Sequence, residues 1–277
     1  MSGGESVDVR SRPPVLLLAG IGLTAAVALR AVHELEKRFR VLPALPGVVA
    51  DDRSAAAPTV TTADDALALL DGAGVDQAHL VGLSFGSAIA QEIAIRHPER
   101  VRSLVLGSST AGGKLYVAPE RPIRQFLWRL PELPAEEGLW AAVPYLYADT
   151  TCRGRAPLIG EDIARRLTRP LDPRSYRAQH EIARAHDTST RLAAITAPTL
   201  VIHGEDDRIL PLDNGRLLAG AISGAQFIPV PAGAHGFPTD VPATGRDLVS
   251  FLLAHSQPHS QPRARRPAAC DARAGRA

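Results

Sequence analysis

Short apolar runs alternate with amphipathic stretches along most of the chain. A continuous apolar run predicts a buried strand, and apolar residues at helical spacing predict a helix. The predicted strands are Val15–Ala19, Arg40–Leu45, Ala78–Leu83, Val101–Leu106, Thr199–His203 and Gln226–Val230. The predicted helices are Thr24–Arg38, Thr62–Leu70 (with Thr62 as its cap), Ser84–His97, Leu212–Ala221 and Asp240–His255. Strands that alternate with helices are typical of βαβ units, so the pattern predicts an α/β fold with a mainly parallel sheet.

The alternation stops between residues 110 and 194. This segment is rich in proline, holds both tryptophans and all four tyrosines of the chain, and has no run that predicts a strand. We predict a helical insertion that covers one end of the sheet. Most of its aromatic side chains would pack the insertion against the body. A few would line a substrate pocket, for which the candidates are Trp128, Trp140, Tyr145 and His186, with Phe237 from a later segment.

A chain of 277 residues is long enough for one large domain with an insertion. Residues 14–109 and 195–255 are predicted to form the α/β core, and residues 110–194 an inserted helical cap. Residues 1–13 and the basic, Pro/Ala-rich segment 256–277 are predicted to be disordered.

Charge and composition argue against a nucleic-acid-binding protein. The formal net charge of the whole chain is +2. The segment from Ser256 contains five arginines and one aspartate, which gives it a net charge of +4. The rest of the chain therefore has a net charge of about −2. A body so close to neutrality offers nucleic acid no basic surface. A small-molecule partner remains, bound by a monomer or a homodimer.

Two cysteines, Cys152 and Cys270, provide no disulfide framework, which fits a cytoplasmic location. The apolar stretch 15–29 has some features of a signal peptide, but Glu5 and Asp8 stand where basic residues are usual. The same stretch is short for a membrane span. We therefore predict a cytoplasmic protein without a membrane partner, with secretion as the alternative.

Residues 82–86 read Gly-Leu-Ser-Phe-Gly, between a predicted strand and a predicted helix. In a Gly-x-Ser-x-Gly turn the two glycines let strand and helix approach, and the serine lies exposed at the sharp bend. The helix that follows directs the positive end of its dipole toward the place where an oxyanion would form. Ser84 is therefore a candidate nucleophile, with Gly82 and Gly86 shaping the turn. An ordinary loop serine is the alternative.

A serine nucleophile needs a base, and the base needs an orienting carboxylate. Asp207 follows one predicted strand and His235 follows the next. Either residue alone could belong to an ordinary turn or loop. Their order after Ser84, each just past a strand end, favours a Ser84–His235–Asp207 triad. No His/Cys/Asp cluster has metal-ligand spacing and no glycine-rich loop fits a dinucleotide, so we predict neither a metal nor a cofactor.

The segments "PVLLLAG", "HLVGLSFGSAIAQEIAIRHPERVRSLVLGSS", "APTLVIHGEDDRILP" and "GAHGFP" together resemble the α/β-hydrolase superfamily. They are most similar to bacterial esterase, lactonase and depolymerase-type members with a helical cap. This resemblance implies Ser84 as nucleophile, His235 as general base and acid, and Asp207 as orienting acid. It also implies an oxyanion hole formed by the backbone N–H groups of Ile21 and Phe85.

The chain departs from the family pattern in three places. Ala19 stands where members often have a histidine, and Ala44 stands where they often have an aspartate. The loop 46–54 is therefore expected to have a different shape. Few residues precede the first strand, so the sheet is expected to have about six to eight strands.

The predicted function is that of a serine hydrolase acting on an ester, lactone or thioester of a small to medium hydrophobic substrate. In the superfamily that the chain resembles, haloalkane dehalogenases and epoxide hydrolases use an aspartate nucleophile. A serine at this turn therefore excludes their mechanisms. One alternative keeps the triad in a cyclase, a transacylase or a C–C hydrolase. The other is a binding protein that has lost catalysis.

Overall fold

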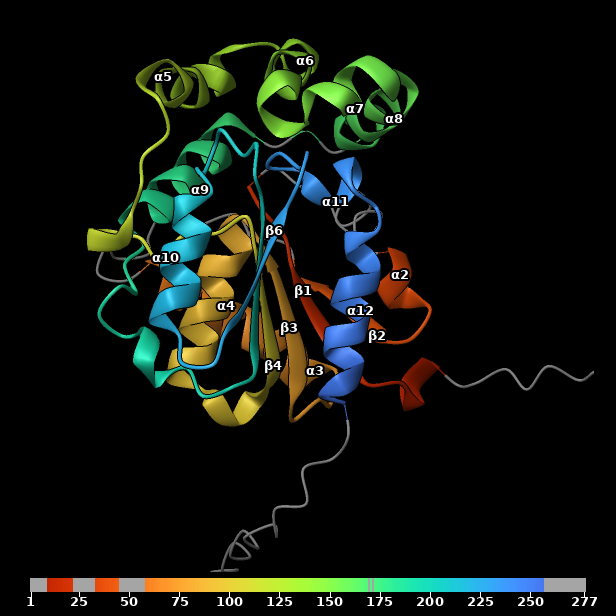
Figure 1. Ribbon diagram of the computed structural model, residues 1–277, viewed down its shortest axis with the longest axis vertical. Helices are drawn as coiled ribbons and strands as arrows, with labels where there is room; N and C mark the ends of the chain where they lie inside the picture. The colour runs from red at the N-terminus through yellow and green to blue at the C-terminus, as the bar shows by residue number, and fades with distance from the viewer. Residues whose placement is uncertain (1–8, 22–32, 45–57, 169, 171, 257–277) are drawn as a thin grey trace, which may run out of the picture.

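A six-stranded parallel sheet is the centre of the computed structural model, which describes residues 9–21, 33–44, 58–168, 170 and 172–256 (Figure 1). The strand order is β2-β1-β3-β4-β5-β6, and every neighbouring pair is parallel. The prediction of a mainly parallel α/β sheet is therefore confirmed. The strands are β1 (Pro14–Leu18), β2 (Arg40–Ala44), β3 (Ala78–Leu83), β4 (Val101–Gly107), β5 (Thr199–Gly204) and β6 (Gln226–Val230).

Helices cover both faces of the sheet, because successive side chains of a strand point to opposite faces. Leu16 and Leu18 of β1 belong to the core beneath α3, α4 and α10, whereas Val15 and Leu17 belong to the core beneath α2 and α12. The helices of the core are α2 (His33–Glu36), α3 (Pro58–Gly72), α4 (Phe85–Arg96), α10 (Asp213–Ala221), the short α11 (Phe237–Asp240) and α12 (Thr244–Ala254). Short 3₁₀ helices are η1 (Val9–Ser11), η2 (Pro98–Arg100), η3 (Gly113–Leu115), η4 (Leu130–Glu132) and η5 (Leu192–Ala194).

Five helices between β4 and β5 lie over the carboxyl ends of the strands (Figure 1). We call them the cap helices: α5 (Arg121–Arg129), α6 (Ala135–Leu146), α7 (Asp149–Gly154), α8 (Ala156–Leu167) and α9 (Pro173–Ala185). The chain leaves and re-enters the core side by side, since Gly112 and Asp187 form an antiparallel bridge and the N–H of Thr188 donates to the carbonyl of Ala111 at 2.8 Å. The division into core and cap domains stays a prediction.

Two predicted helix boundaries are wrong. The helix expected to begin at Thr62 begins at Pro58, so Thr62 lies inside α3 and does not cap it. A proline suits the first turn of a helix because its fixed φ is already helical. The helix expected over Asp240–His255 begins only at Thr244, as α12, while Asp240 ends the short α11; Pro242 between them has no N–H to donate to a continuous helix.

Several predictions fall on residues outside the described ranges. The predicted helix Thr24–Arg38 is described only from His33, and the loop 46–54 and Cys270 are not described. Cys152 is a free cysteine. None of the described helices is long and apolar enough to cross a membrane.

The turn between β3 and α4 brings the helix directly onto the end of β1. A Cβ atom on Gly86 would overlap the carbonyl oxygen of Leu18, and one on Gly82 would lie 2.6 Å from Cα of Ser87. Ser84 has φ 52° and ψ −120°, a region that residues other than glycine rarely adopt. The two glycines therefore make room for a sharp turn that holds Ser84 beyond the end of its strand.

We expect Gly86→Ala to destabilise the fold by at least about 3 kcal/mol, because the new methyl group meets rigid backbone of β1. Urea unfolding measures this. The control is Gly160→Ala in α8, where a Cβ has no neighbour within 4 Å. That change is expected to leave the free energy of unfolding unchanged or raise it by up to about 1 kcal/mol. A Gly86→Ala protein as stable as the wild type would contradict this view of the turn.

Candidate active site

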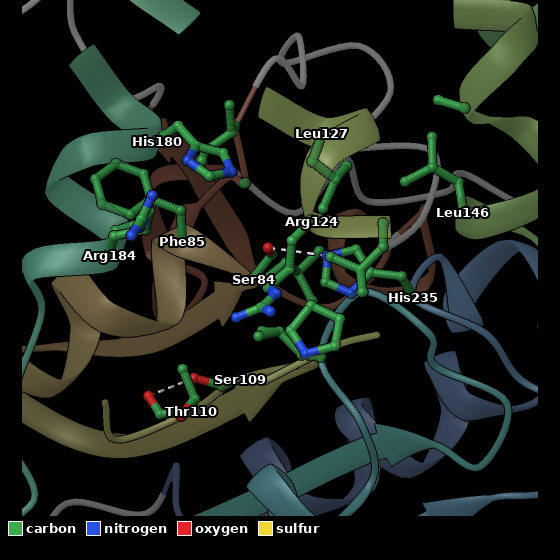
Figure 2. A pocket seen from close by; sticks show the side chains of 18 of the residues that line it. Ser84, Phe85, Ser109, Thr110, Arg124, Leu127, Leu146, His180, Arg184 and His235 are labelled. Atoms are coloured by element: carbon green, nitrogen blue, oxygen red, sulfur yellow. Dashed lines mark hydrogen bonds between the residues drawn. The ribbon is translucent and has the colours of Figure 1, made fainter. Parts of the chain in front are cut away.

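Ser84, His235 and Asp207 form one continuous hydrogen-bonded chain at the carboxyl ends of the strands. His235 Nδ1 lies 2.8 Å from Asp207 Oδ2, and His235 Nε2 lies 2.9 Å from Ser84 Oγ (Figure 2). A carboxylate only accepts hydrogen bonds, so the ring proton is on Nδ1 and Nε2 accepts from the serine hydroxyl. The structure thus brings together the three side chains predicted from the sequence. Their order, serine to histidine to aspartate, is the one that proton transfer from the serine requires.

The side chain of Asp207 is fully buried. Its Oδ1 accepts from the backbone N–H groups of Ile209 and Leu210, at 2.9 and 2.8 Å. Burial alone would raise the pKa of Asp207, but the contacts with His235 and His203 outweigh burial and hold that pKa well below its usual range. The carboxylate is therefore kept ionised next to the imidazole that it orients.

His203, on the strand before the acid, contacts the carboxylate of Asp207. Its side chain is fully buried, and its Nε2 lies 2.8 Å from the carbonyl of Leu210 and 3.3 Å from Asp207 Oδ2. The available signal was its position on a buried strand, four residues before the acid. His203 ties both the carboxylate and the turn around it to β5.

The backbone around Ser84 offers donors to a developing negative charge. Phe85 begins α4, so its N–H is among those at the positive end of the helix dipole. Gly20 and Ile21 follow β1 and line the same cavity as Ser84, Phe85 and His235. The structure thus places both predicted oxyanion donors at one cavity, and their role as donors stays a prediction.

A cavity of about 860 Å³ separates Ser84 from the cap helices, within the range usual for small-molecule sites. Much of its wall on the cap side is apolar. The apolar side chains that line it from this side include Leu127, Leu130, Leu139, Ala142 and Leu146. The arrangement can hold a small to medium molecule with an apolar body against the serine.

Two of the five predicted pocket residues line this cavity, and three do not. Trp128 and His186 are lining residues. Trp140 is exposed, because α6 turns the neighbouring Leu139 toward the cavity. The prediction for Tyr145 is wrong as well. Its ring packs against the ring of Phe126, and the guanidinium group of Arg208 lies over it.

Phe237 is the third incorrect pocket residue. Its side chain is fully buried, and it packs in the core beneath the sheet with residues of β1, β5 and α12. A sequence shows that a residue is apolar and near the site. It does not show whether the side chain points into a pocket or into the core.

His186 closes the cavity wall on the side of α9. It is almost completely buried, its Nε2 lies 3.4 Å from both Gln91 Oε1 and Thr188 Oγ1, and its Nδ1 has no hydrogen-bond partner. Burial lowers the pKa of His186 to about 4. The imidazole is therefore neutral at physiological pH. Among the described residues, no three His, Cys, Asp or Glu side chains are grouped as metal ligands.

The chain is similar to known proteins over most of its length. A model described as the alpha/beta hydrolase family matches residues 15–245. A relative from Azorhizobium caulinodans named "Putative carbamate hydrolase RutD" is 31% identical over 240 residues, 85% of this chain and 89% of that protein. A Comamonas testosteroni protein named "2-hydroxy-6-oxo-6-phenylhexa-2,4-dienoate hydrolase" is 34% identical over 162 residues, 57% of this chain and 56% of that protein.

Solved structures show the same fold. The enol-lactonase from Burkholderia xenovorans LB400 superposes with a TM-score of 0.72 at 23% identity, over 88% of this chain and 92% of that chain. At this identity the likeness concerns the fold alone.

The buried His186 makes a testable contribution to acid stability. Its pKa of about 4 in the folded protein lies below the ordinary value of 6.5, so the unfolded chain takes up the proton first. Stability is therefore present above pH 6.5 and is lost as the pH falls toward 4. Glu92, Asp187 and Arg191 are the charged groups around it, and Arg191 is paired with Glu92.

We expect the free energy of unfolding of the wild type to fall by up to about 3 kcal/mol more than that of His186→Gln between pH 6.5 and 4. Urea unfolding across this range measures the difference. Above pH 7.5 the difference between the two proteins should be constant, which serves as the internal control. If the free energy of unfolding of wild type and of His186→Gln changed equally between pH 6.5 and 4, the buried imidazole of His186 would not be neutral as described.

Proposed function

Because the chain belongs to the alpha/beta hydrolase family, we propose that it is a serine hydrolase that uses a Ser84–His235–Asp207 triad. The observation that carries this proposal is the continuous chain of contacts, 2.9 Å from serine to histidine and 2.8 Å from histidine to carboxylate. The enclosing cavity and the hydrolase names of the relatives support it. The intact hydrogen-bonded chain argues against a binding protein that has lost catalysis.

The first half-reaction forms an acyl-enzyme. His235 Nε2 removes the hydroxyl proton of Ser84 as Oγ attacks the carbonyl carbon of an ester, lactone or thioester. Asp207 stabilises the imidazolium that forms. The backbone N–H groups of Phe85 and Ile21 donate to the tetrahedral oxyanion, and each such donor contributes about 2.7–4 kcal/mol to transition-state stability. When the intermediate collapses, His235 gives its proton to the leaving alcohol or thiol.

The second half-reaction hydrolyses the acyl-enzyme. His235 removes a proton from a water molecule, whose oxygen attacks the acyl carbon. The bond to Ser84 Oγ breaks, the serine takes back the proton from His235, and a carboxylic acid is released. The cavity volume and the apolar side chains on the cap side support a small to medium substrate with an apolar body.

A second candidate function is cleavage of a carbon–carbon bond by the same triad. The observation in its favour is the 34% identity over 162 residues to a relative named as a dienoate hydrolase. Transacylation and cyclisation share the acyl-enzyme and differ in what attacks it. The prediction of a cytoplasmic monomer or homodimer without a cofactor is part of this proposal.

A fluorophosphonate probe is expected to label the wild type and not Ser84→Ala, because the probe reacts with an activated serine. Mass spectrometry of the labelled peptide locates the adduct. Ser109→Ala is the matched control, since Ser109 lines the same cavity and should leave labelling unchanged. Equal labelling of Ser84→Ala and wild type would show that another residue is the nucleophile. Labelling without hydrolysis of p-nitrophenyl butyrate would favour the second candidate.

Asp207→Asn is expected to lower kcat about 10,000-fold, as the equivalent change does in a well-studied serine protease. The backbone N–H groups of Ile209 and Leu210 require an oxygen acceptor, so the new amide would turn its NH₂ toward His235. The imidazole would then carry its proton on Nε2 and could not accept from Ser84. Steady-state ester hydrolysis measures the effect.

The matched control for this change is Asp206→Asn. Asp206 is the exposed neighbour of the acid and should leave kcat within about twofold of wild type. A similar loss of kcat in both variants would indicate that the substitutions disturb the turn, and not that Asp207 acts by orienting the imidazole of His235.

A further inference from the structure

The cavity above Ser84 is strongly basic on its cap side. Its described lining residues include four arginines and neither an aspartate nor a glutamate. They come from three cap helices, α5, α8 and α9. The arginines are Arg121, Arg124, Arg166 and Arg184. A wholly hydrophobic substrate gives no reason for this charge.

Arg124 and Arg184 approach the same side chain although they come from different helices. Burial raises the pKa of Tyr116, and the guanidinium groups of Arg124 and Arg184 both oppose that rise. Arg184 also adds to the effect of burial in lowering the pKa of His180. Figure 2 shows Arg124, Arg184 and His180 among the side chains around the cavity that holds Ser84. Both guanidinium groups thus belong to the lining of the cavity that holds Ser84.

Two other arginines on the same helices, Arg129 and Arg177, form ion pairs with a carboxylate of the protein. Arg129 of α5 lies 3.2 Å from a carboxylate oxygen of Glu132, and Arg177 of α9 lies 3.6 Å from the other oxygen. The ion pairs among the described residues include neither Arg124 nor Arg184. Arg129 and Arg177 therefore have a carboxylate from the protein, whereas the described ion pairs give none to Arg124 or Arg184.

Arg166 is a third positive charge in the wall, but its surroundings differ. Burial lowers its pKa, and the nearby Asp162, Tyr147 and Tyr176 oppose that effect. Its Nε is buried without a hydrogen-bond partner. Because Asp162 already compensates part of its charge, we assign the ligand contact to Arg124 and Arg184.

We propose that the substrate carries an anionic group, in addition to the carbonyl that reacts, and that Arg124 and Arg184 bind this group. Two unpaired guanidinium groups in one wall repel each other, and an anion removes that repulsion. Each guanidinium offers a planar fork that matches the oxygens of a carboxylate or a phosphate. This inference rests on the proposed function and specifies its substrate: an apolar body against the leucines, with an anionic end at the arginines.

The test is a calorimetric titration of Ser84→Ala, which binds without turnover. The carboxylate probe is monobutyl glutarate, and butyl methyl glutarate is its neutral counterpart. We expect the carboxylate to bind about ten- to a hundredfold more tightly than the diester. Adding Arg124→Gln and Arg184→Gln should remove this preference and leave the affinity for the diester within about twofold. Monobutyl phosphate, titrated in parallel, shows whether phosphate or carboxylate is the preferred anion.

The controls are Arg129→Gln and Arg177→Gln, which remove the same charge from the same two helices outside the cavity. Both should retain the preference for the carboxylate. Because Arg124 and Arg184 are exposed, higher salt should weaken binding of the carboxylate and not of the diester. Equal affinity for the acid and the diester would overturn the proposal, and so would an equal loss of preference in the control variants.

Failure of this inference can be told apart from failure of the proposed function. Binding of monobutyl glutarate does not require Ser84 to be a nucleophile. If fluorophosphonate fails to label the wild type while the carboxylate preference holds, the anion site stands and the serine mechanism is wrong. If labelling succeeds and the preference is absent, the serine hydrolase stands and the anionic substrate is wrong.

Discussion

The close approach of α4 to the end of β1 is the constraint on which the rest of the site depends. Only a residue without a side chain fits at Gly86, where a Cβ would overlap the backbone of Leu18. This contact fixes the sharp turn that exposes Ser84 beyond β3. It also places the first N–H groups of α4 beside the loop that follows β1, where Ile21 lines the cavity. The proposed nucleophile, the helix dipole and the proposed second backbone donor are thus brought together by one backbone contact.

The enclosed carboxylate is the second organising feature. Asp207 receives two backbone N–H groups and the contacts of two histidines, so its charge is almost fully compensated within the protein. A compensated charge orients His235 without presenting a negative potential to the cavity. The neutral His186 in the cavity wall adds no charge of its own. The electrostatic potential within the cavity is therefore set by the helix N-terminus and by the arginines of the cap.

The sequence predicted the sheet well because its strands are buried runs with strong local signals. Each strand lies within one or two residues of its predicted bounds, and the three residues of the proposed triad were predicted from their places at strand ends. The pocket wall was harder to predict. Trp140, Tyr145 and Phe237 are aromatic and close to the site in the chain, but the direction of a side chain depends on how each helix packs in three dimensions. No local pattern encodes that direction.

The direction of the arginine side chains in the cap could not be predicted from the sequence either. Arg124 and Arg184 are about sixty residues apart in the chain and lie among many other arginines, so composition alone does not distinguish them. Only the folded cap separates the arginines that meet Glu132 from those that face the cavity. An anionic substrate bound there would enter a positive potential that also favours the oxyanion at Ser84. Substrate binding and catalysis would then depend on the same arrangement of charges, since positive groups line the cavity and the carboxylate proposed to orient His235 is buried behind the imidazole.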